Sequence, residues 1–315
     1  MRFKHNNDSN ARQLPLYLAR QLRLIVLIAL AIALSAFSSC ASKDAMPADA
    51  RTVTDELGRT VTVTPHPRRI VSLAPSITET LFALGLGDSI VGVTSYCDYP
   101  PEALQKERIG DTMRPSIEKI VALKPDLAIA STASQLEQFV SKLDEVGIPV
   151  YISTPLDLEG VLMSITKLGD LTARSDHANE LTARLRARIE AVRERVMNRE
   201  RPRVLFILGT EPLIIAGGKS FINDLITQAG GRSISQDEKT EYPQYSLETV
   251  VARQPEVIFL QAGEASLPER LKQTPAAQSG RVFRLNDDLI IRPGPRIIDG
   301  LEQMAALIHP EGGKH

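Results

Sequence analysis

Tyrosines gather in two loops of the chain, next to prolines. Four of the six tyrosines lie there: Tyr96, Tyr99, Tyr242 and Tyr245. A tyrosine offers a wide contact surface with a polar tip and few rotatable bonds to immobilise, which suits a large, flat and partly polar ligand. The alternative is that these rings only pack against the prolines and stabilise turns. We interpret the two loops as parts of a binding site.

Charged residues offer polar contacts in the second half of the chain. Asp287, Asp288, Arg292 and Arg296 lie in and beside a stretch with two prolines and a glycine, which predicts a loop over 287–295. Carboxylate and guanidinium groups in a loop can orient a polar ligand. This stretch therefore joins the tyrosine loops as a candidate contact region.

Motifs of catalysis and metal binding are missing from the sequence. Gly217-Gly218-Lys219-Ser220 ends like a phosphate-binding P-loop, but that motif needs a glycine at 213, where the chain has leucine. There is no G-x-S-x-G or H-E-x-x-H pattern. The five histidines are not spaced as metal ligands and are expected at the surface, and Cys97 is expected to be a half-buried thiol. These observations predict a binding protein without metal or cofactor, not an enzyme.

The beginning of the chain has the pattern of an export signal. Basic residues precede an apolar run over 24–37, which is too short to span a membrane. Ser38 and Ser39 precede Cys40, and small residues before a cysteine resemble the lipidation motif of bacterial lipoproteins, although Phe37 replaces the usual leucine. We expect a lipoprotein signal peptide over 1–39, lipidation at Cys40 and a flexible tether over 40–51. The product would be an exported, periplasmic and membrane-anchored protein; a cleaved soluble protein and a retained anchor are the alternatives.

Composition places the rest of the chain among ordinary globular proteins. The 315 residues are 43% hydrophobic and 24% charged, which is typical of a soluble protein with about two domains. The net charge of −1 gives no reason to expect a nucleic-acid partner.

An internal repeat indicates two similar lobes. Residues 116–130 (SIEKIVALKPDLAIA) match residues 246–260 (SLETVVARQPEVIFL) in their serine, glutamate, alanine and proline positions. Each copy reads as a serine-capped helix, a proline turn and a buried strand, and each follows another strand and helix. Two αβ lobes of one plan have a cleft between them, and such clefts are favoured ligand sites.

A long amphipathic helix is expected between the copies, over 175–199, with Ser175 as its N-cap. Its apolar residues, at steps of three and four, are Leu181, Leu185, Ile189, Val192 and Val196. The predicted fold is therefore α/β: two Rossmann-like αβ lobes (52–174 and 200–309) joined by a single long rigid helix, with the ligand cleft between the lobes. Residues 310–315 form a tail.

Three stretches carry a family resemblance: Ile70–Glu79 (IVSLAPSITE), Tyr96–Ala103 (YCDYPPEA) and Ile120–Asp126 (IVALKPD). They resemble the helical-backbone solute-binding proteins of ABC importers for cobalamin, haem and iron siderophores. The resemblance covers about residues 52 to 309. The Asp-Tyr-Pro-Pro sequence at 98–101 favours the vitamin B12-binding (BtuF) type.

The resemblance and the strand-end loops together imply a ligand site. Its expected members are Pro75, Ser76, Tyr96, Tyr99, Thr112, Met113, Ile214, Tyr242, Asp288, Leu289, Ile290, Ile291 and Arg292. The implied ligand is cobalamin or a related corrinoid. Tryptophans of the cobalamin-binding proteins correspond to Thr112, Tyr242 and Leu289 here, and a further aromatic residue to Ile214, so haem or a ferric siderophore stays the alternative. Met113 and Tyr96 are the only candidates for haem iron.

The resemblance also implies partners. Glu118 and Glu248, one per lobe, resemble the glutamates that dock onto arginines of a permease dimer, whose separate ATPase supplies the energy. A two-fold permease needs one acid at equivalent sites of each lobe, although both could be ordinary acids of a first helical turn. The binding protein itself is expected to be a monomer. An enzyme or metal carrier of the same two-lobe plan would need clustered ligands across the cleft, which the sequence does not offer.

Overall fold

The structure is a computed structural model that describes residues 50–131, 136–263 and 266–310. The expected signal peptide, Cys40, nearly all of the tether and the tail after 310 lie outside the described residues, so the hypotheses of export and lipidation stay predictions. None of the described helices combines the length and the apolar character needed to cross a bilayer.

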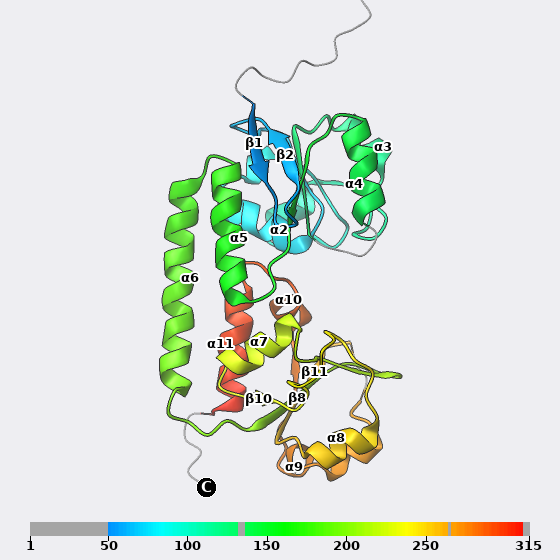
Figure 1. The fold of residues 1–315 in the computed structure, drawn as a ribbon, viewed down its shortest axis with the longest axis vertical. Coiled ribbons are helices and arrows are strands. Elements are labelled where there is room, and N and C mark those ends of the chain that lie inside the picture. The colour runs from blue at the N-terminus through cyan, green and yellow to red at the C-terminus, as the bar shows by residue number, and fades with distance from the viewer. Residues whose placement is uncertain (1–49, 132–135, 264–265, 311–315) are drawn as a thin grey trace, which may run out of the picture. The chain divides into compact units, whose positions relative to one another are not determined.

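Parallel strands form the sheet of the N-terminal lobe (Figure 1). In spatial order they are β5 (Glu107–Arg108), β4 (Ile90–Val93), β3 (Ile70–Ser72), β6 (Leu127–Ser131) and β7 (Val150–Ser153). The chain leaves β3 toward β4 on one side and returns to β6 on the other, so the strand order reverses beside β3. The crevice at the carboxyl ends of strands at such a reversal is a common ligand site. An antiparallel hairpin of β1 (Arg51–Thr54) and β2 (Thr60–Val63) precedes the sheet.

The C-terminal lobe repeats this plan. Its parallel strands are, in order, β10 (Arg232–Ser233), β8 (Arg203–Thr210), β11 (Val257–Gln261) and β12 (Val282–Leu285), and β9 (Leu213–Ile215) adds antiparallel to β8. The repeated stretches hold the same places, because β6 lies beside β3 as β11 lies beside β8. The predicted two-lobe arrangement is confirmed.

Helices cover both faces of each sheet. They are α2 (Pro75–Ala83), α3 (Ile117–Ala122), α4 (Leu136–Glu145), α5 (Leu158–Leu171), α6 (Ser175–Val196), α7 (Phe221–Gln228), α8 (Leu247–Arg253), α9 (Pro275–Gln278), α10 (Asp287–Ile290) and α11 (Ile297–Ile308). Short 3-10 helices lie at Gly87–Ser89, Pro101–Gln105 and Glu269–Gln273. Buried parallel sheets need such cover on both sides, which explains the continuous apolar runs of their strands.

Alternate strand residues enter different cores. In β6, Leu127 and Ile129 join a core that continues through both lobes, whereas Ala128 and Ala130 join a second core beneath α3 and α4. A third core lies beneath α8 and α9. The continuous core contains residues of α2, α5, α6, α7 and α11, so the two lobes share one hydrophobic interior.

The long helix α6 connects the lobes by packing on α5 of the first and α11 of the second. The predicted apolar stripe is buried, and Ala178 extends it. At 1.5 Å per residue the helix is about 33 Å long. The helix begins at Ser175 as predicted, but the predicted N-cap was wrong: Arg174 is the N-cap, and the Ser175 hydroxyl donates to Asp170 instead. The predicted end was also wrong, because the helix ends at Val196 rather than Arg199.

Local sequence decided several other boundaries. Ser116 and Ser246 are N-caps as predicted, and each accepts a hydrogen bond from the amide three residues later. The helix α2 begins at Pro75, whose fixed φ suits a first helical position, and its N-cap Ala74 makes no side-chain hydrogen bond. The predicted loop 287–295 contains α10, which starts where Asn286 accepts from the Asp288 amide.

Candidate ligand-binding site

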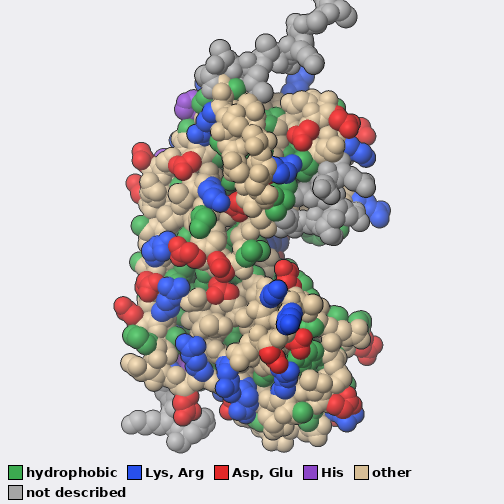
Figure 2. Space-filling view, in the orientation of Figure 1, with side chains coloured by type: hydrophobic (Ala, Val, Ile, Leu, Met, Phe, Trp, Pro, Cys, Tyr) green, Lys and Arg blue, Asp and Glu red, His purple; other side chains and the backbone are tan. Residues whose placement is uncertain are grey.

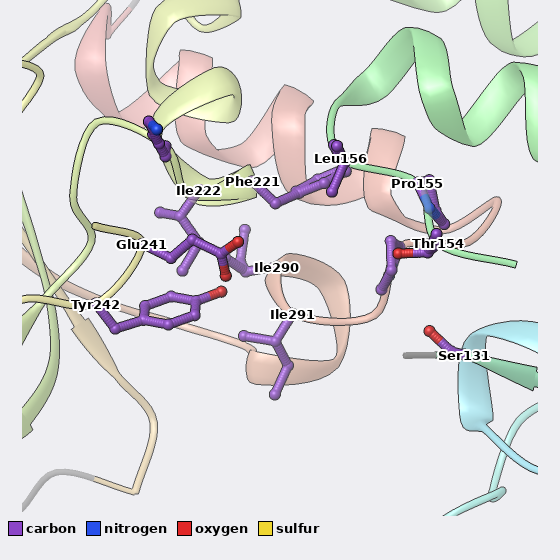
Figure 3. A pocket seen from close by; sticks show the side chains of 12 residues that line it. Ser131, Thr154, Pro155, Leu156, Phe221, Ile222, Glu241, Tyr242, Ile290 and Ile291 are labelled. Atoms are coloured by element: carbon purple, nitrogen blue, oxygen red, sulfur yellow. The ribbon is translucent and has the colours of Figure 1, made fainter. Parts of the chain in front are cut away.

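A pocket of about 320 Å³ lies between the lobes and takes its walls from both. It is lined by Ser131, Thr154, Pro155 and Leu156 of the N-terminal lobe and by Lys219, Phe221, Ile222, Glu241, Tyr242, Ile290, Ile291 and Pro293 of the C-terminal lobe (Figure 3). Its volume is within the range of small-molecule sites. Figure 2 shows the surface hollowed between the lobes on the right-hand side.

Strand ends and helix starts bring these side chains together. Ser131 ends β6 and Thr154 directly follows its neighbour β7, so both lie at the carboxyl edge of the N-terminal sheet. Phe221 and Ile222 open α7, which the Ser220 side chain caps by accepting from the Asn223 amide.

Apolar side chains stay exposed at the pocket. Leu156 is 72% exposed, Ile291 48% and Tyr242 47%. Exposed apolar groups that converge on one hollow mark a surface that a ligand covers. Lys219 and Glu241 are the charged residues among those that line the pocket.

The structure places three of the expected ligand residues in the pocket wall: Tyr242, Ile290 and Ile291. Leu289 lies beside them on α10, but its carbonyl oxygen faces Gly300 of α11 so closely that a Cβ at 300 would lie 2.1 Å from it. Glycine at 300 therefore lets α10 pack on α11 and present the isoleucines to the pocket.

Other expected residues lie elsewhere on the lobes. Tyr96 and Met113 are 59% and 52% exposed, and neither they nor Thr112 line the pocket. Ile214 on β9 pairs with Gln244. Tyr245 supports its own lobe, because its hydroxyl donates to Glu238 at 2.7 Å and the Arg253 guanidinium lies 5.5 Å from its ring centre. The assignment of Tyr96, Thr112, Met113 and Ile214 to a ligand stays a prediction.

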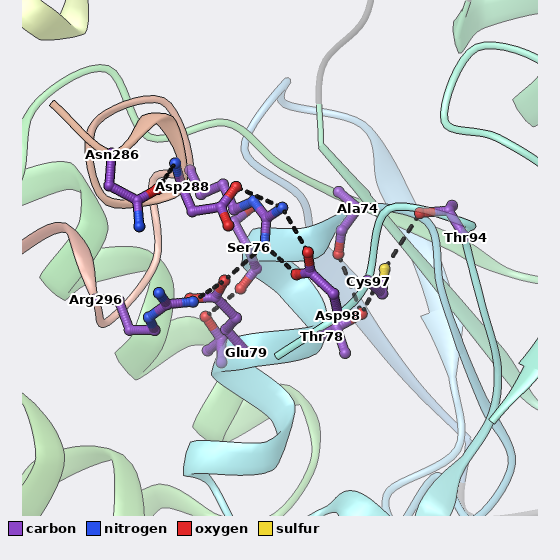
Figure 4. A network of polar contacts seen from close by, with 12 residues as sticks. Ala74, Ser76, Thr78, Glu79, Thr94, Cys97, Asp98, Asn286, Asp288 and Arg296 are labelled. Carbon is purple, nitrogen blue, oxygen red and sulfur yellow. Dashed lines mark hydrogen bonds and ion pairs between the residues drawn. The ribbon is translucent and has the colours of Figure 1, made fainter. Parts of the chain in front are cut away.

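A polar network joins the lobes beside the pocket (Figure 4). Arg292, in the segment after α10, contacts Asp98 of the N-terminal lobe and Asp288 of its own lobe, each at 2.6 Å. It also reaches Glu79 on α2, at 3.4 Å. Expected ligand residues Asp288 and Arg292 thus pair with each other and with the opposite lobe.

A second arginine, Arg296, takes part in the same polar network between the lobes. Arg296 donates to Glu79 at 3.3 Å, and its guanidinium lies 3.9 Å from the centre of the Tyr99 ring. This cation–π contact engages the expected ligand residue Tyr99. Nearby, a Cβ at Gly294 would lie 3.1 Å from the carbonyl oxygen of Ser76, so the expected residues Pro75 and Ser76 border the lobe contact rather than the pocket.

Burial and pairing shift the acids of this network in opposite directions. Burial raises the pKa of Glu79 to about 7, although both arginines oppose the rise. The hydrogen bond from Arg292 lowers the pKa of Asp98, which is half exposed. The two acids contact one guanidinium but differ in their access to water.

Two residues set aside in the sequence are more buried than expected. Cys97 is fully buried rather than half-buried, and its sulfur lies 3.1 Å from the Thr78 hydroxyl and 3.2 Å from that of Thr94. His309 is not at the surface: it is 8% exposed, with Nε2 3.2 Å from the carbonyl oxygen of Gly230. Both pack inside their lobes.

The paired glutamates are exposed at equivalent places. Glu118 lies in the first turn of α3 and accepts from the Ser116 hydroxyl at 2.9 Å. Glu248 lies in the first turn of α8 and pairs with Arg270 at 2.5 Å. Among the described residues, Glu118 thus has no ion pair, whereas Glu248 is paired with an arginine of its own chain.

The sequence did not single out several functional candidates. Ser131 and Thr154 lie at the carboxyl ends of β6 and β7. The rule that ligands bind at such strand ends would have identified them, but it was applied only to the loops after β3 and β4. Leu156 and Glu241 have no local signal, because they become neighbours only when the lobes meet. Glu79 reads in the sequence as an ordinary helix acid.

Comparisons with known proteins agree with this architecture. Residues 70–289 match the model of the periplasmic binding protein family. The chain is 33% identical over 241 residues to the vitamin B12-binding protein of Vibrio campbellii, an alignment that covers 75% of this chain and 88% of that protein.

Solved structures point the same way. The periplasmic vitamin B12-binding protein BtuF of Vibrio cholerae superposes with a TM-score of 0.69 and 33% identity, over 77% of this chain and 96% of that one. The periplasmic heme-binding protein RhuT of Roseiflexus gives a TM-score of 0.70 and 30% identity, over 76% and 97%. With two αβ lobes, a connecting helix and a pocket between the lobes, the chain belongs to the periplasmic binding protein family.

Proposed function

We propose that this protein binds cobalamin or a related corrinoid in the pocket between its lobes and delivers it to the permease of an ABC importer. The observation that carries the proposal is the pocket itself, which has exposed apolar walls and, among the described residues, only Lys219 and Glu241 as charged lining residues. The similarity to vitamin B12-binding proteins supports the same cargo.

The charges around the pocket favour a ligand with few anionic groups. A corrinoid carries uncharged amides around its ring, whereas haem carries two propionates and many ferric siderophores are anionic. Arginine is the usual partner of such carboxylates. The arginines beside this pocket, Arg292 and Arg296, already face Glu79, Asp98 and Asp288.

The pocket walls suit a flat ring with a polar rim. Tyr242 and Ile291 present exposed apolar surface from the C-terminal lobe, and the opposite wall combines the exposed Leu156 with the hydroxyl-bearing Ser131 and Thr154. Such hydroxyls can donate to or accept from side-chain amides of a corrinoid. A volume of about 320 Å³ holds part of so large a ligand, and the rest would lie in the open hollow between the lobes.

A calorimetric titration of the purified protein with cyanocobalamin tests the proposal. Binding with a micromolar or lower Kd is the expected result. A folded protein that gives no heat and no thermal stabilisation with cyanocobalamin would refute corrinoid binding.

Haem is the second candidate, because a heme-binding protein is also similar at 30% identity over nearly its whole length. Haem binding would bring a Soret shift in the absorption spectrum, and its propionates would either contact Lys219 in the pocket wall or displace acids from Arg292 or Arg296. Titrating haemin and cyanocobalamin into the same preparation distinguishes the two cargoes.

Delivery requires the chain to be exported and to dock. We propose that a signal peptide directs it to the periplasm and that Cys40 anchors it to a membrane by lipidation, with the residues after Cys40 as a tether. Glu118 and Glu248 then contact arginines of a permease dimer, one glutamate per subunit. Their exposure and their equivalent positions at α3 and α8 support this role.

A further inference from the structure

A buried carboxyl group lies where the lobes touch, outside the pocket. Glu79 on α2 has 2% of its side chain exposed. Its Oε1 accepts from Arg292 at 3.4 Å and from Arg296 at 3.3 Å, both from the opposite lobe. Its Oε2 is buried and has no hydrogen-bond partner among the described residues. A single oxygen of Glu79 therefore makes all of the pairing.

This geometry is that of a neutral acid. Charge-assisted hydrogen bonds are usually about 2.7–2.9 Å long, and Arg292 approaches Asp98 and Asp288 at 2.6 Å. The contacts of Glu79 are longer. Burying a charged oxygen without any partner costs far more free energy than burying a neutral carboxyl oxygen without one, so the unpartnered Oε2 favours the protonated form.

The charge count of the network agrees. The groups that face Glu79 directly are Arg292, Arg296 and Asp288, and the two arginines link it to Asp98 and Tyr99. With Glu79 protonated, the two arginines balance the charge of Asp98 and Asp288, both of which contact Arg292, and the network is neutral. Ionised Glu79 adds a third negative charge in a buried place, and burial accordingly raises its pKa to about 7.

Arg292 and Arg296 support one wall of the pocket from the side that faces away from the ligand. Arg292 is flanked in sequence by Ile291 and Pro293, both of which line the pocket, while its own side chain reaches the N-terminal lobe. We propose that Glu79 is a positioning residue for ligand recognition: its protonated carboxyl group seats the arginines of the segment 291–296 and thereby fixes this wall against the other lobe.

The proposal predicts the direction of a pH effect. When the segment 291–296 moves away from the N-terminal lobe (the released state), water reaches Glu79 and the pKa of Glu79 returns toward the ordinary 4.5. Glu79 therefore binds its proton more tightly when the segment is in contact with that lobe (the seated state). Raising the pH therefore favours release of the segment. With pKa values of about 7 seated and 4.5 released, the equilibrium constant for release rises about tenfold between pH 6 and pH 8.

Hydrogen exchange of the ligand-free protein measures this equilibrium. After correction for intrinsic rates, the protection of the backbone amides of 291–299 is expected to fall about tenfold from pH 6 to pH 8. Glu79→Gln, which is always neutral, should show no such fall. Glu102→Gln, at an exposed carboxylate of the same lobe, should keep it.

A tenfold fall that persists in Glu79→Gln, or its absence in the unsubstituted protein, overturns the proposal. If Glu79→Gln does not fold, a ¹³C NMR titration of the Glu79 carboxyl group decides instead: a midpoint near 7 supports the proposal, and one near 4.5 refutes it. Neither measurement uses a ligand, so the result is independent of whether the pocket binds corrinoids. If the pocket binds a corrinoid, the Kd should also depend less on pH in Glu79→Gln than in the unsubstituted protein. A role of Glu79 in packing alone would not produce this difference.

Discussion

Replacing Glu79 by glutamine should remove a large pH dependence from the stability of the whole protein. Burial raises the pKa of Glu79 from 4.5 to about 7, so the folded state binds this proton more tightly than the unfolded state. The stabilisation from proton binding is complete below pH 4.5 and is lost as the pH rises through 7. A shift of about 2.5 units, at 1.36 kcal/mol per unit, corresponds to about 3 kcal/mol.

Urea unfolding at pH 5 and pH 8 measures the difference. The chain has no tryptophan, so far-ultraviolet circular dichroism follows the transition. The unsubstituted protein should lose about 2–3 kcal/mol more between these pH values than Glu79→Gln does. Comparing the two proteins cancels the other titrating groups, such as His309, whose pKa burial lowers.

The comparison between variants decides the outcome. Equal losses in the two proteins would mean that Glu79 does not titrate in this range and that its arginines keep it charged. A Glu79→Gln protein less stable by the same amount at both pH values would mean that the ionised pair stabilises the fold. Glu102→Gln serves again as the control and should follow the unsubstituted protein.

Three further variants test the docking surface, the packing of α10 and the pocket. Glu118→Ala combined with Glu248→Ala should weaken binding to the permease at least tenfold, because two charge contacts are lost, and leave ligand affinity unchanged in calorimetry. Gly300→Ala places a Cβ 2.1 Å from the Leu289 carbonyl oxygen; calorimetric melting should show about 1–3 kcal/mol of destabilisation, and the displaced α10 should weaken ligand binding. Tyr242→Ala removes a half-exposed ring from the pocket; corrinoid affinity should fall about fivefold or more, or about 1 kcal/mol, with little change in Tm.

Matched variants control for nonspecific effects. Gly263→Ala should be harmless, because apart from its chain neighbours no described residue has an atom within 4 Å of the added Cβ. Leu104→Ala removes another exposed apolar side chain, one outside the pocket, and the ligand affinity of this variant should stay unchanged. Loss of ligand affinity in the double glutamate variant would contradict the docking role of the two glutamates. An unchanged melting curve for Gly300→Ala would contradict the tight packing of α10 on α11. An unchanged ligand affinity for Tyr242→Ala would contradict the location of the binding site.

Features with a local cause could be predicted from the sequence. The caps at Ser116 and Ser246 depend on residues three positions away, and the buried stripe of α6 depends on helical spacing, so both were found. Where two local preferences competed, the prediction failed. Ser175 could cap the helix or bind Asp170, and the second prevailed.

The candidate site depends on contacts between distant parts of the chain. Thr154 and Tyr242 share a pocket only because the lobes face each other, and the residues next to them in the sequence do not indicate this contact. Arg292 was expected to contact ligand, and the structure engages it with acids of both lobes. The protonation of Glu79 follows from burial, which no spacing of residues reveals.

The shared core has a consequence for the order of assembly. Both sheets are complete once β12 has been made, but α10 and α11 come later in the chain. These helices bring Ile290 to the pocket, Arg292 and Arg296 to the opposite lobe, and Ile297 to the continuous core. A chain that emerges with its amino-terminal end first therefore has all strands of both sheets before it has this wall of the pocket. A protease that removes the last helices would take away that wall and part of the shared core together.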